Sequence, residues 1–307
     1  MHGEANGSDN RVARGVEYAV AAYLLWGFLT IYWKQLDGFD AVELIAWRMV
    51  CASVVMAVVV TVRGSWSTMR VAFSSRSTVL RLAAAAALLT INWGSYVWAV
   101  VNDRVIETAL GYFLAPLGTM AIGVLVFGET PTRAQRVAFV LASIAVVVLT
   151  VSYGRPPWIA VVIAATWSAY GAAKRTISLG PVESLAGETF IAIVPAAIGI
   201  VALSFGATSV VSSATPTEWV FVLGTGIVTA VPLMLFARAA QTVPFTLLGP
   251  LNLLVPVINF GLGWWWYGES MPAERIVGFA FVWAALFVVT WDQVSTRRRV
   301  APMRATA

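Results

Sequence analysis

Residues 109–129, ALGYFLAPLGTMAIGVLVFGE, are matched by residues 247–269, LLGPLNLLVPVINFGLGWWWYGE. At an offset of 140 residues, four positions recur without a gap: Pro116, Gly123, Gly128 and Glu129 fall on Pro256, Gly263, Gly268 and Glu269. Both stretches are apolar and are interrupted by proline and glycine at corresponding places. A duplicated, membrane-sized unit with such interruptions is typical of secondary transporters and indicates where their site lies.

The same offset relates residues outside these two stretches. The further matches are Val42, Glu43, Ala46, Val137, Phe139, Ala145, Val148 and Thr150 with Val182, Glu183, Ala186, Val277, Phe279, Ala285, Val288 and Thr290. The chain is therefore interpreted as two copies of one unit, residues 15–151 and 152–291. Polar tails flank them at residues 1–14 and 292–307, and the second tail is basic.

The composition indicates an integral membrane protein. Of 307 residues, 59% are hydrophobic and 11% are charged, and the mean hydropathy of +0.81 exceeds that of soluble domains. Apolar runs of bilayer length predict an all-α protein with ten spans, at residues 16–33, 41–62, 79–101, 105–127, 134–151, 157–172, 187–204, 218–237, 244–266 and 273–291. The short alternating segments of a membrane β-barrel are absent from the sequence.

The positive charges predict the orientation. Fifteen fall on one predicted side, at residues 11, 14, 63, 70, 76, 81, 133, 136, 174, 175, 238, 297, 298, 299 and 304, against Lys34, Arg104, Arg155 and Arg275 on the other. The positive-inside rule then places both termini in the cytoplasm. Because each copy holds five spans, the second copy enters the membrane from the opposite side. The duplication is therefore predicted to be inverted.

Two charges lie at membrane depth, and the offset maps one onto the other. Arg48 lies about seven residues into its span, in AVELIAWRMV, and Glu188 lies just inside its own, in PVESLAGETF. Each charge needs a partner or a water-filled cavity, since a charge is costly in the hydrocarbon. Two interpretations remain open: a substrate-facing or proton-coupled pair, or a structural ion pair between the halves.

Other candidates lie in or near the broken spans. Pro116 and Pro256 are interpreted as lining the substrate path, although close packing of small residues is the alternative. Polar and aromatic side chains deep in the spans either bind substrate or join helices: Asn92, Trp93, Tyr96, Tyr112, Tyr170, Asn252 and Asn259. The predicted substrate-binding residues are Arg48, Asn92, Trp93, Tyr96, Tyr112, Pro116, Glu188, Asn252, Pro256 and Asn259. Glu129 and Glu269, each after a glycine at a span end, are interpreted as turn and cap residues.

No catalytic site, metal site or cofactor is predicted. His2 is the single histidine and lies in the polar tail, and Cys51 is the single cysteine, which removes an internal disulfide. The spans contain no paired carboxylates for a membrane-embedded enzyme, and no GxxxxGK[ST] loop for direct use of ATP. The chain is therefore not expected to be an enzyme.

The chain resembles the drug/metabolite transporter superfamily, and within it the RarD branch of EamA-repeat permeases. The segments that carry the resemblance are AAYLLWGFLTIYWKQL (21–36), AVELIAWRMV (41–50), NWGSYVWAVVNDRVIETALGYFLAPL (92–117), FGE (127–129), SAYGAAKR (168–175), GETFIAIVP (187–195) and GIVTAVPLMLFARAA (226–240). The resemblance implies two inverted five-helix EamA-type repeats and a cavity among the third, fourth, eighth and ninth spans. The sequence departs from the branch at Trp47, where a histidine is frequent, and at Ala115, where an asparagine precedes the proline.

The function predicted from these features is secondary transport. The protein is expected to export a small metabolite or drug across the plasma (inner) membrane by alternating access. The alternatives are a channel or a non-transporting sensor, with a membrane-embedded enzyme least favoured. The expected partners are a small-molecule substrate and the lipid bilayer, nucleic acid is not expected, and a homodimer is left open.

Overall fold

The computed structural model describes residues 2–206, 208–243 and 251–300, and this part of the chain contains helices and no strands. The long helices are α1 (His2–Gly27), α3 (Ala41–Arg63), α5 (Arg76–Val101), α6 (Val105–Phe127), α7 (Arg133–Tyr153), α8 (Trp158–Lys174), α9 (Pro181–Leu203), α11 (Pro216–Thr242) and α14 (Ala273–Val300). The shorter elements are α2 (Leu29–Trp33), the 3₁₀ helix η1 (Lys34–Leu36), α4 (Trp66–Ser74), α10 (Val210–Ser213), α13 (Leu254–Gly261) and the π-helix η2 (Leu262–Trp266).

Eight described helices are long and apolar enough to cross a membrane. The predicted span 157–172 is not among them, because the 17 residues of α8 extend over about 25 Å, less than a hydrocarbon core of about 30 Å. The predicted span 244–266 falls partly on residues 244–250, which lie outside the described residues. Its remainder forms α13 and η2. A multi-span, all-helical membrane protein is thus confirmed, and the full count of ten remains a prediction.

Helix boundaries recur at the same offset as the sequence matches. Three pairs of helices begin 140 residues apart: α3 and α9 at Ala41 and Pro181, α5 and α11 at Arg76 and Pro216, and α7 and α14 at Arg133 and Ala273. The capping chemistry differs within a pair. Asp40 accepts hydrogen bonds from the backbone N–H groups of Val42 and Glu43 at 2.8 and 3.1 Å, whereas Gly180 precedes α9 without a side-chain cap. The positions of the helix starts therefore depend on the pattern of apolar spans more than on any one type of capping residue.

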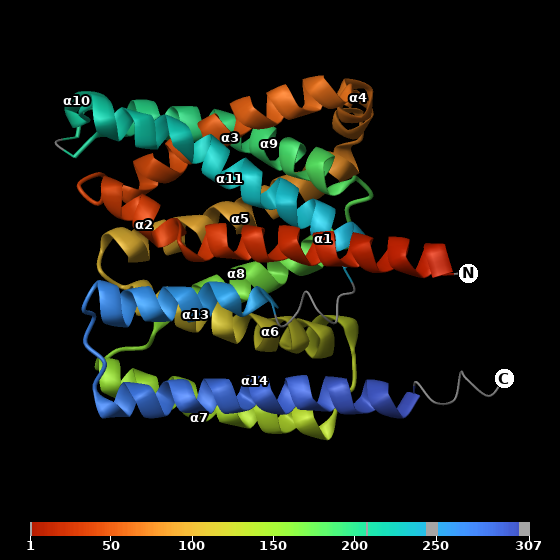
Figure 1. Ribbon diagram of the computed structural model, residues 1–307. Helices are drawn as coiled ribbons and strands as arrows, with labels where there is room; N and C mark the ends of the chain where they lie inside the picture. Colours follow the sequence, from red (N-terminus) through yellow and green to blue (C-terminus); the bar gives the residue numbers. More distant parts are fainter. Residues whose placement is uncertain (1, 207, 244–250, 301–307) are drawn as a thin grey trace.

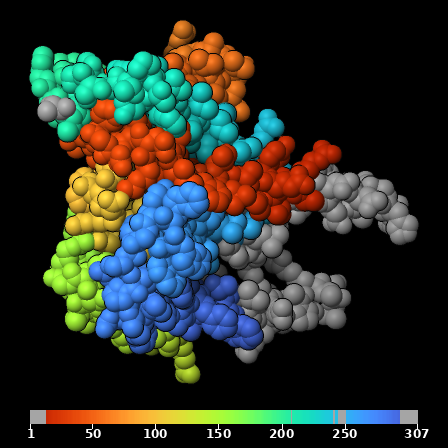
Figure 2. Space-filling model, turned by 60° about the vertical axis from the view of Figure 1, so that its left-hand side comes forward, coloured from red at the N-terminus to blue at the C-terminus, as the bar shows by residue number. Residues whose placement is uncertain are grey.

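Helices from the two halves pack against each other in pairs. α3 contacts α9, α7 contacts α14, α6 contacts α13, α1 contacts α11, and α5 contacts α8. In Figure 1 the pair α7 and α14 forms the lowest layer, and α3, α9 and α11 form an upper layer. α13 lies at the surface between α1 and α14 (Figure 2). Glycines allow close approach, since a Cβ on Gly226 of α11 would lie 2.5 Å from the carbonyl oxygen of Cys51 on α3.

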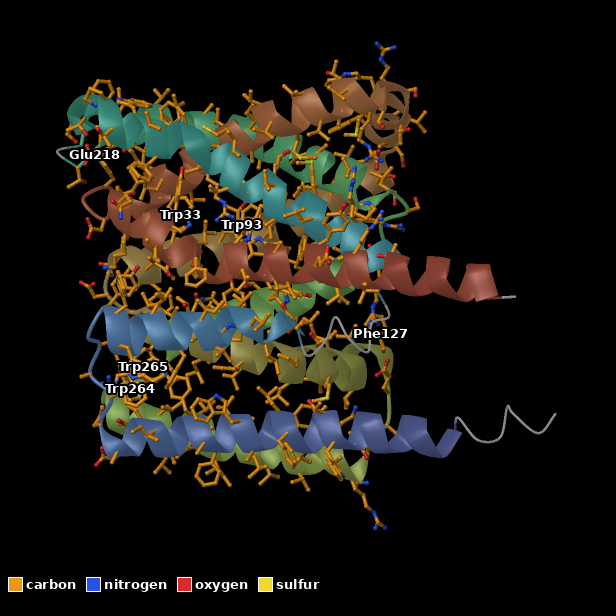
Figure 3. All side chains as sticks on the ribbon, viewed as in Figure 1. Trp33, Trp93, Phe127, Glu218, Trp264 and Trp265 are labelled. Atoms are coloured by element: carbon orange, nitrogen blue, oxygen red, sulfur yellow. The ribbon has the colours of Figure 1, made fainter. Side chains whose placement is uncertain are left out.

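The bundle has two ends, and each carries one of the two groups of positive residues that the sequence separates. The start of α1 and the end of α14 lie at one end, here called the terminal face, and the opposite end is called the far face (Figure 1). Phe127 lies at the terminal face, and Trp264 and Trp265 lie at the far face (Figure 3). Helix ends place Arg63, Arg76, Arg133 and Lys174 at the terminal face, and Lys34, Arg104, Arg155 and Arg275 at the far face. The two groups of positive charge that the sequence separates are thus separated in space.

Candidate functional site

Two cavities that share part of their walls lie among α1, α3, α5, α6, α8, α9, α11 and the start of α13. The narrow cavity, of about 90 Å³, is lined by Trp26, Leu29, Arg48, Leu89, Trp93, Tyr96, Tyr112, Ala115, Trp167, Tyr170, Leu185, Leu233, Asn252, Val255 and Pro256. The wide cavity, of about 490 Å³, is lined by Tyr23, Trp26, Met56, Thr119, Trp167, Tyr170, Gly171, Lys174, Pro181, Val182, Leu185, Leu233, Met234, Phe236, Ala237 and Asn252. The shared wall residues show that the two cavities are adjacent, and together they are here called the path.

The path runs from the middle of the bundle to the terminal face. The wide cavity is lined by the last residue of α8, Lys174, and the first residue of α9, Pro181, and both lie at that face. The narrow cavity contains Arg48, which lies near the middle of α3. The path therefore extends from the ends of α8 and α9 to the part of α3 that carries Arg48.

Arg48 is almost completely buried, with 2% of its surface exposed. Its Nε donates a hydrogen bond to the hydroxyl of Thr229 at 3.0 Å. The guanidinium lies over the ring of Trp93, 3.8 Å from the centroid, and 5.5 Å from the centroid of the Trp33 ring. These tryptophans lie close together in the middle of the view in Figure 3. Cation–π contacts of this kind stabilise a charge that has left water.

Glu188 does not pair with Arg48. Its Oε1 accepts from Lys174 Nζ at 2.6 Å and from the Ser184 hydroxyl at 2.9 Å, and its Oε2 accepts from the Tyr170 hydroxyl at 3.0 Å. The side chain of Glu188 is 1% exposed and lies outside both walls. The offset of 140 gives Arg48 and Glu188 equivalent places on their helices, but the Lys174 ammonium at the end of α8 reaches the carboxylate.

The structure brings six of the ten predicted site residues to the narrow cavity: Arg48, Trp93, Tyr96, Tyr112, Asn252 and Pro256. Besides Glu188, three lie outside both walls. The side chain of Asn92 joins helices, donating to the Ile163 carbonyl and the Thr166 hydroxyl, each at 3.0 Å. Pro116 lies inside α6, next to the wall residue Ala115. Asn259 is fully buried, with no side-chain hydrogen-bond partner among the described residues.

Sequence reasoning missed several wall residues, of which Trp26, Trp167 and Lys174 matter most. Trp167 lies one turn before Tyr170 on α8, so the two rings share a helix face, and their centroids are 6.0 Å apart. The signal was present, because aromatic residues at this spacing in a membrane helix mark one face. The sequence alone does not tell whether that face meets a cavity or lipid. From the sequence, Lys174 serves only as one of the positive residues that predict the orientation.

A polar cluster joins four segments at the far face. Lys34 forms an ion pair with Asp103, and Arg155 forms one with Glu107. The carboxylate of Glu269 accepts hydrogen bonds from the backbone N–H groups of Val105 and Ile106 at the start of α6, the second at 3.1 Å. Arg275 donates to the Ser270 carbonyl at 2.6 Å. All four positive residues of the far face lie in or beside this cluster: Lys34, Arg104, Arg155 and Arg275.

Glu269 has a perturbed pKa. Burial raises the pKa of its carboxyl to about 7, against the opposing effect of the hydrogen bonds from Ile106 and Val105. The neighbouring carboxylates Asp103 and Glu107 add to the rise. None of these five residues lines the narrow or the wide cavity. The cluster thus ties the far face together, at the end of the bundle away from the opening of the path.

Comparison with known proteins agrees with this architecture. A model of the EamA-like transporter family matches residues 13–151 and again residues 157–291. The chain belongs to the EamA-like transporter family. Each match covers one of the two apolar units, so the family's unit is present twice.

Similar proteins show which members of the EamA family this chain is related to. Protein RarD of Streptomyces exfoliatus is 40% identical over 95% of this chain and 93% of its own length. Protein RarD of Escherichia coli is 31% identical over 94% and 97% of the two chains. An uncharacterized transporter of Bacillus subtilis, YojE, is 31% identical over 93% and 96%. The chain is an EamA-type, RarD-like permease, as its sequence predicted, and a membrane transporter.

A solved structure, described only as "Crystal structure of protein", shows the same fold. It covers 91% of this EamA permease and 98% of its own chain, and it superposes with a TM-score of 0.58 at 19% identity. At this identity the likeness concerns the fold alone.

The two departures from the RarD branch have different surroundings in this EamA permease. Ala115 lies on the narrow cavity, so it contributes a small apolar side chain to the wall. Trp47 lies outside both cavity walls. Its ring contacts Trp219 with centroids 5.1 Å apart, and its Nε1 donates to Glu43 at 3.3 Å. Of the two departures, Ala115 therefore changes the cavity directly.

Proposed function

We propose that this EamA-type permease is a secondary transporter that exports a small metabolite or drug across the plasma (inner) membrane by alternating access. The observation that carries the proposal is that the terminal face is open to the path, whereas polar contacts hold the far face closed. A path reaches Arg48 from the terminal face, while ion pairs and the Glu269 hydrogen bonds tie the far face. A carrier needs one end open and the other closed.

The proposal includes ten spans in two inverted five-helix repeats, residues 15–151 and 152–291. It is supported by helix starts 140 residues apart and by equivalent helices that run in opposite directions. α3 begins at the far face, whereas α9 begins at the terminal face, and the two helices pack together. Inverted repeats of this kind exchange the shapes of their halves and so alternate which end is open.

The terminal face is proposed to be cytoplasmic. The sequence assigns fifteen lysine and arginine residues to the side of this face and four to the side of the far face, and the positive-inside rule places the more positive side in the cytoplasm. The path then opens to the cytoplasm, where an exported substrate is loaded. This orientation is compatible with export, since an exporter loads its substrate in a state that is open to the cytoplasm.

The substrate is proposed to contact Arg48, Trp93, Tyr96, Tyr112, Asn252 and Pro256, which line the narrow cavity. The remaining predicted residues are proposed to act from behind the wall. Asn92 holds α5 to α8, and Glu188 holds Lys174 at the mouth of the path. Pro116 and Asn259 lie on α6 and α13, whose relative movement alternating access requires.

The first test measures metabolites in cells that lack or overproduce the permease. An exporter predicts at least one small molecule that accumulates inside the deletion strain and outside the overproducing strain. The same molecule should show saturable counterflow in proteoliposomes, with and without a pH gradient. The exposed-surface variant Arg70→Gln should behave like the wild type. Ohmic current without counterflow would identify a channel, and unchanged metabolite pools with no flux would favour a sensor.

A further inference from the structure

The guanidinium of Arg48 is a buried cation that has no carboxylate partner in the part of the chain that the structure describes. The ion pairs among the described residues involve Lys34, Arg63, Arg155 and Lys174, and none involves Arg48. Its Nε is bonded to Thr229, but its Nη1 is buried and has no hydrogen-bond partner among the described residues. A buried donor left in this condition is costly, and a charged one more so. The side chain lies on the wall of the narrow cavity.

A second unsatisfied donor lies on the same wall. The hydroxyl of Tyr96 is buried, 4% of the residue is exposed, and the group has no hydrogen-bond partner among the described residues. Tyr96 and Arg48 both line the narrow cavity. The wall of one cavity therefore includes two residues, one with a cationic N–H donor and one with a neutral O–H donor, whose buried donor atoms have no partner among the described residues.

The charges of the path are unbalanced. Lys174, on the wall of the wide cavity, is neutralised by Glu188. No aspartate or glutamate lines either cavity among the described residues. The inner end of the path therefore carries net positive charge, which opposes a cationic ligand and favours an anionic one.

We propose that the substrate is a small carboxylate with an apolar or aromatic body. Its carboxylate binds the guanidinium of Arg48 and the hydroxyl of Tyr96 once these side chains turn toward the narrow cavity, because a guanidinium presents donors that match a carboxylate. Its body lies among Trp26, Trp167 and Tyr170, the aromatic side chains shared by both cavities. The inference rests on the proposed transport function and names the substrate class of that site.

The test compares ligands that share a body and differ in charge. Purified full-length protein in nanodiscs is titrated with 3-phenylpropionate, 3-phenylpropionamide and 3-phenylpropylamine, and with octanoate and octanamide, with tryptophan fluorescence as the readout. At least one carboxylate should bind about tenfold or more tightly than its amide, as expected when a charge-assisted bond replaces a neutral one. The amine should bind most weakly. This ranking in the wild-type protein needs no variant.

Variants then assign the preference to Arg48. Arg48→Gln keeps a donor for Thr229 and removes the charge, and it should reduce the preference for carboxylate over amide to less than about twofold. Arg70→Gln, which removes an arginine exposed on α4, should keep the wild-type ranking. Equal binding of carboxylate and amide, preference for the amine, absence of binding by both carboxylates, or tighter binding of phenyl phosphate than of 3-phenylpropionate overturns the proposal.

Counterflow of the same compounds in proteoliposomes separates this inference from the transport function. Carboxylate-selective binding without counterflow supports the anion site and contradicts transport. Counterflow of the amide at the rate of the carboxylate, or faster, supports transport and overturns the anion site.

Discussion

Two turns of the molecule have nearly the same backbone conformation, but their side chains make different contacts. One turn ends α6 at the terminal face, and the other follows η2 at the far face (Figure 3). Gly128 and Gly268 have φ values of +66° and +67°. The N–H of Glu129 donates to the Gly123 carbonyl at 3.0 Å, and the N–H of Glu269 donates to the Gly263 carbonyl at 2.9 Å. Glycine is favoured at both helix ends because its positive φ is unstrained.

The side chains of the two turns differ. Glu269 accepts hydrogen bonds from the start of α6, whereas Glu129 is exposed and accepts no hydrogen bond from the described residues. A Cβ on Gly263 would lie 2.6 Å from the Ile106 side chain and 3.1 Å from its backbone nitrogen. A Cβ on Gly123 would meet only the flexible side chain of Glu129. One turn therefore supports a closed end, and its counterpart does not.

The comparison suggests how alternating access uses a repeated element. The same glycine–glutamate turn is present at both ends, so each end has the means to hold a neighbouring helix. In the described state only the far-face turn does so. The following predictions test whether that contact closes the far face.

The largest effect is expected from locking the far face. In a Cys51→Ala background, Lys34→Cys with Asp103→Cys is joined by a short bifunctional thiol reagent, in place of the ion pair found there. Counterflow should fall by about tenfold or more, since a carrier that cannot open one end cannot complete its cycle. A matched reaction of Glu129→Cys with Arg175→Cys, both at the terminal ends of the packed helices α6 and α8, should leave flux largely intact. Equal loss in both pairs contradicts the comparison.

Removing the carboxylate at each turn is expected to have the next largest effect. Glu269→Ala leaves two N–H groups at the start of α6 without their acceptor, at a cost of about 1–3 kcal/mol to the closed far face. Glu129→Ala should cost less than about 0.5 kcal/mol, as for an exposed side chain. The measurement is the labelling rate of a cysteine at Tyr267, which should rise only in the Glu269 variant. A similar rise in both variants would show that neither turn is specific to closure.

Substitution of the paired glycines Gly263 and Gly123 should give a smaller difference in the stability of the closed far face. Gly263→Ala should destabilise the closed far face by about 1–3 kcal/mol, because the methyl group crowds Ile106. Gly123→Ala should change it by less than about 0.5 kcal/mol, since the Glu129 side chain can move away. Thermal unfolding in detergent, together with the same labelling assay, distinguishes the two. Equal melting temperatures would mean that α6 does not need this close contact.

The pH dependence of closure is the smallest expected effect. The Glu269 pKa is raised to about 7 when the carboxyl is buried, whereas a glutamate exposed by opening titrates near about 4.3. The closed far face therefore binds a proton more readily, so closure is most favourable below that lower pKa and weakens as pH rises through about 7. The cysteine-labelling rate should increase several-fold between pH 5.5 and pH 8.

Glu269→Gln provides the control for pH. The amide stays neutral and still accepts a hydrogen bond from α6, so this variant should label slowly at both pH values. A wild-type rate that falls with rising pH, or a Gln variant that keeps the wild-type dependence, would exclude Glu269 as the titrating group.

Much of the architecture was predictable, because the signals are local. Apolar runs of bilayer length and the positive residues between them predicted the eight helices of the described residues that are long and apolar enough to cross a membrane. The interruptions at Pro116 and Pro256 lie on α6 and α13, and both helices contribute residues to the narrow cavity, although of the two prolines only Pro256 reaches its wall. Arg48 was found because a charge inside an apolar run is unusual. Family membership followed from short segments of sequence that lie in both halves of the chain.

The partners of the polar side chains were not predictable. Lys174 lies only 14 residues from Glu188, yet the sequence suggested Arg48 as the partner, since the repeat gives the two charges equivalent positions. Asn92 and Asn252 are both asparagines inside apolar runs, so the sequence does not distinguish them. In the structure Asn92 faces α8, whereas Asn252 lines the cavity. These outcomes depend on how each helix is rotated about its own axis. That rotation is set by the helices packed around it, which belong partly to the other half of the chain.

The sequence by itself determined that the chain lies in a membrane, about where the eight long apolar helices of the described residues lie, and which of their ends carry positive charge. These features follow from hydrophobicity and from turn chemistry within a few residues. The tertiary structure alone decided that Arg48 faces a path without a carboxylate, that Glu188 neutralises Lys174, and that Glu269, but not Glu129, holds a helix start. The physical reason is that a buried charge or donor is satisfied by whatever lies within hydrogen-bond reach, and packing between distant segments decides what lies there.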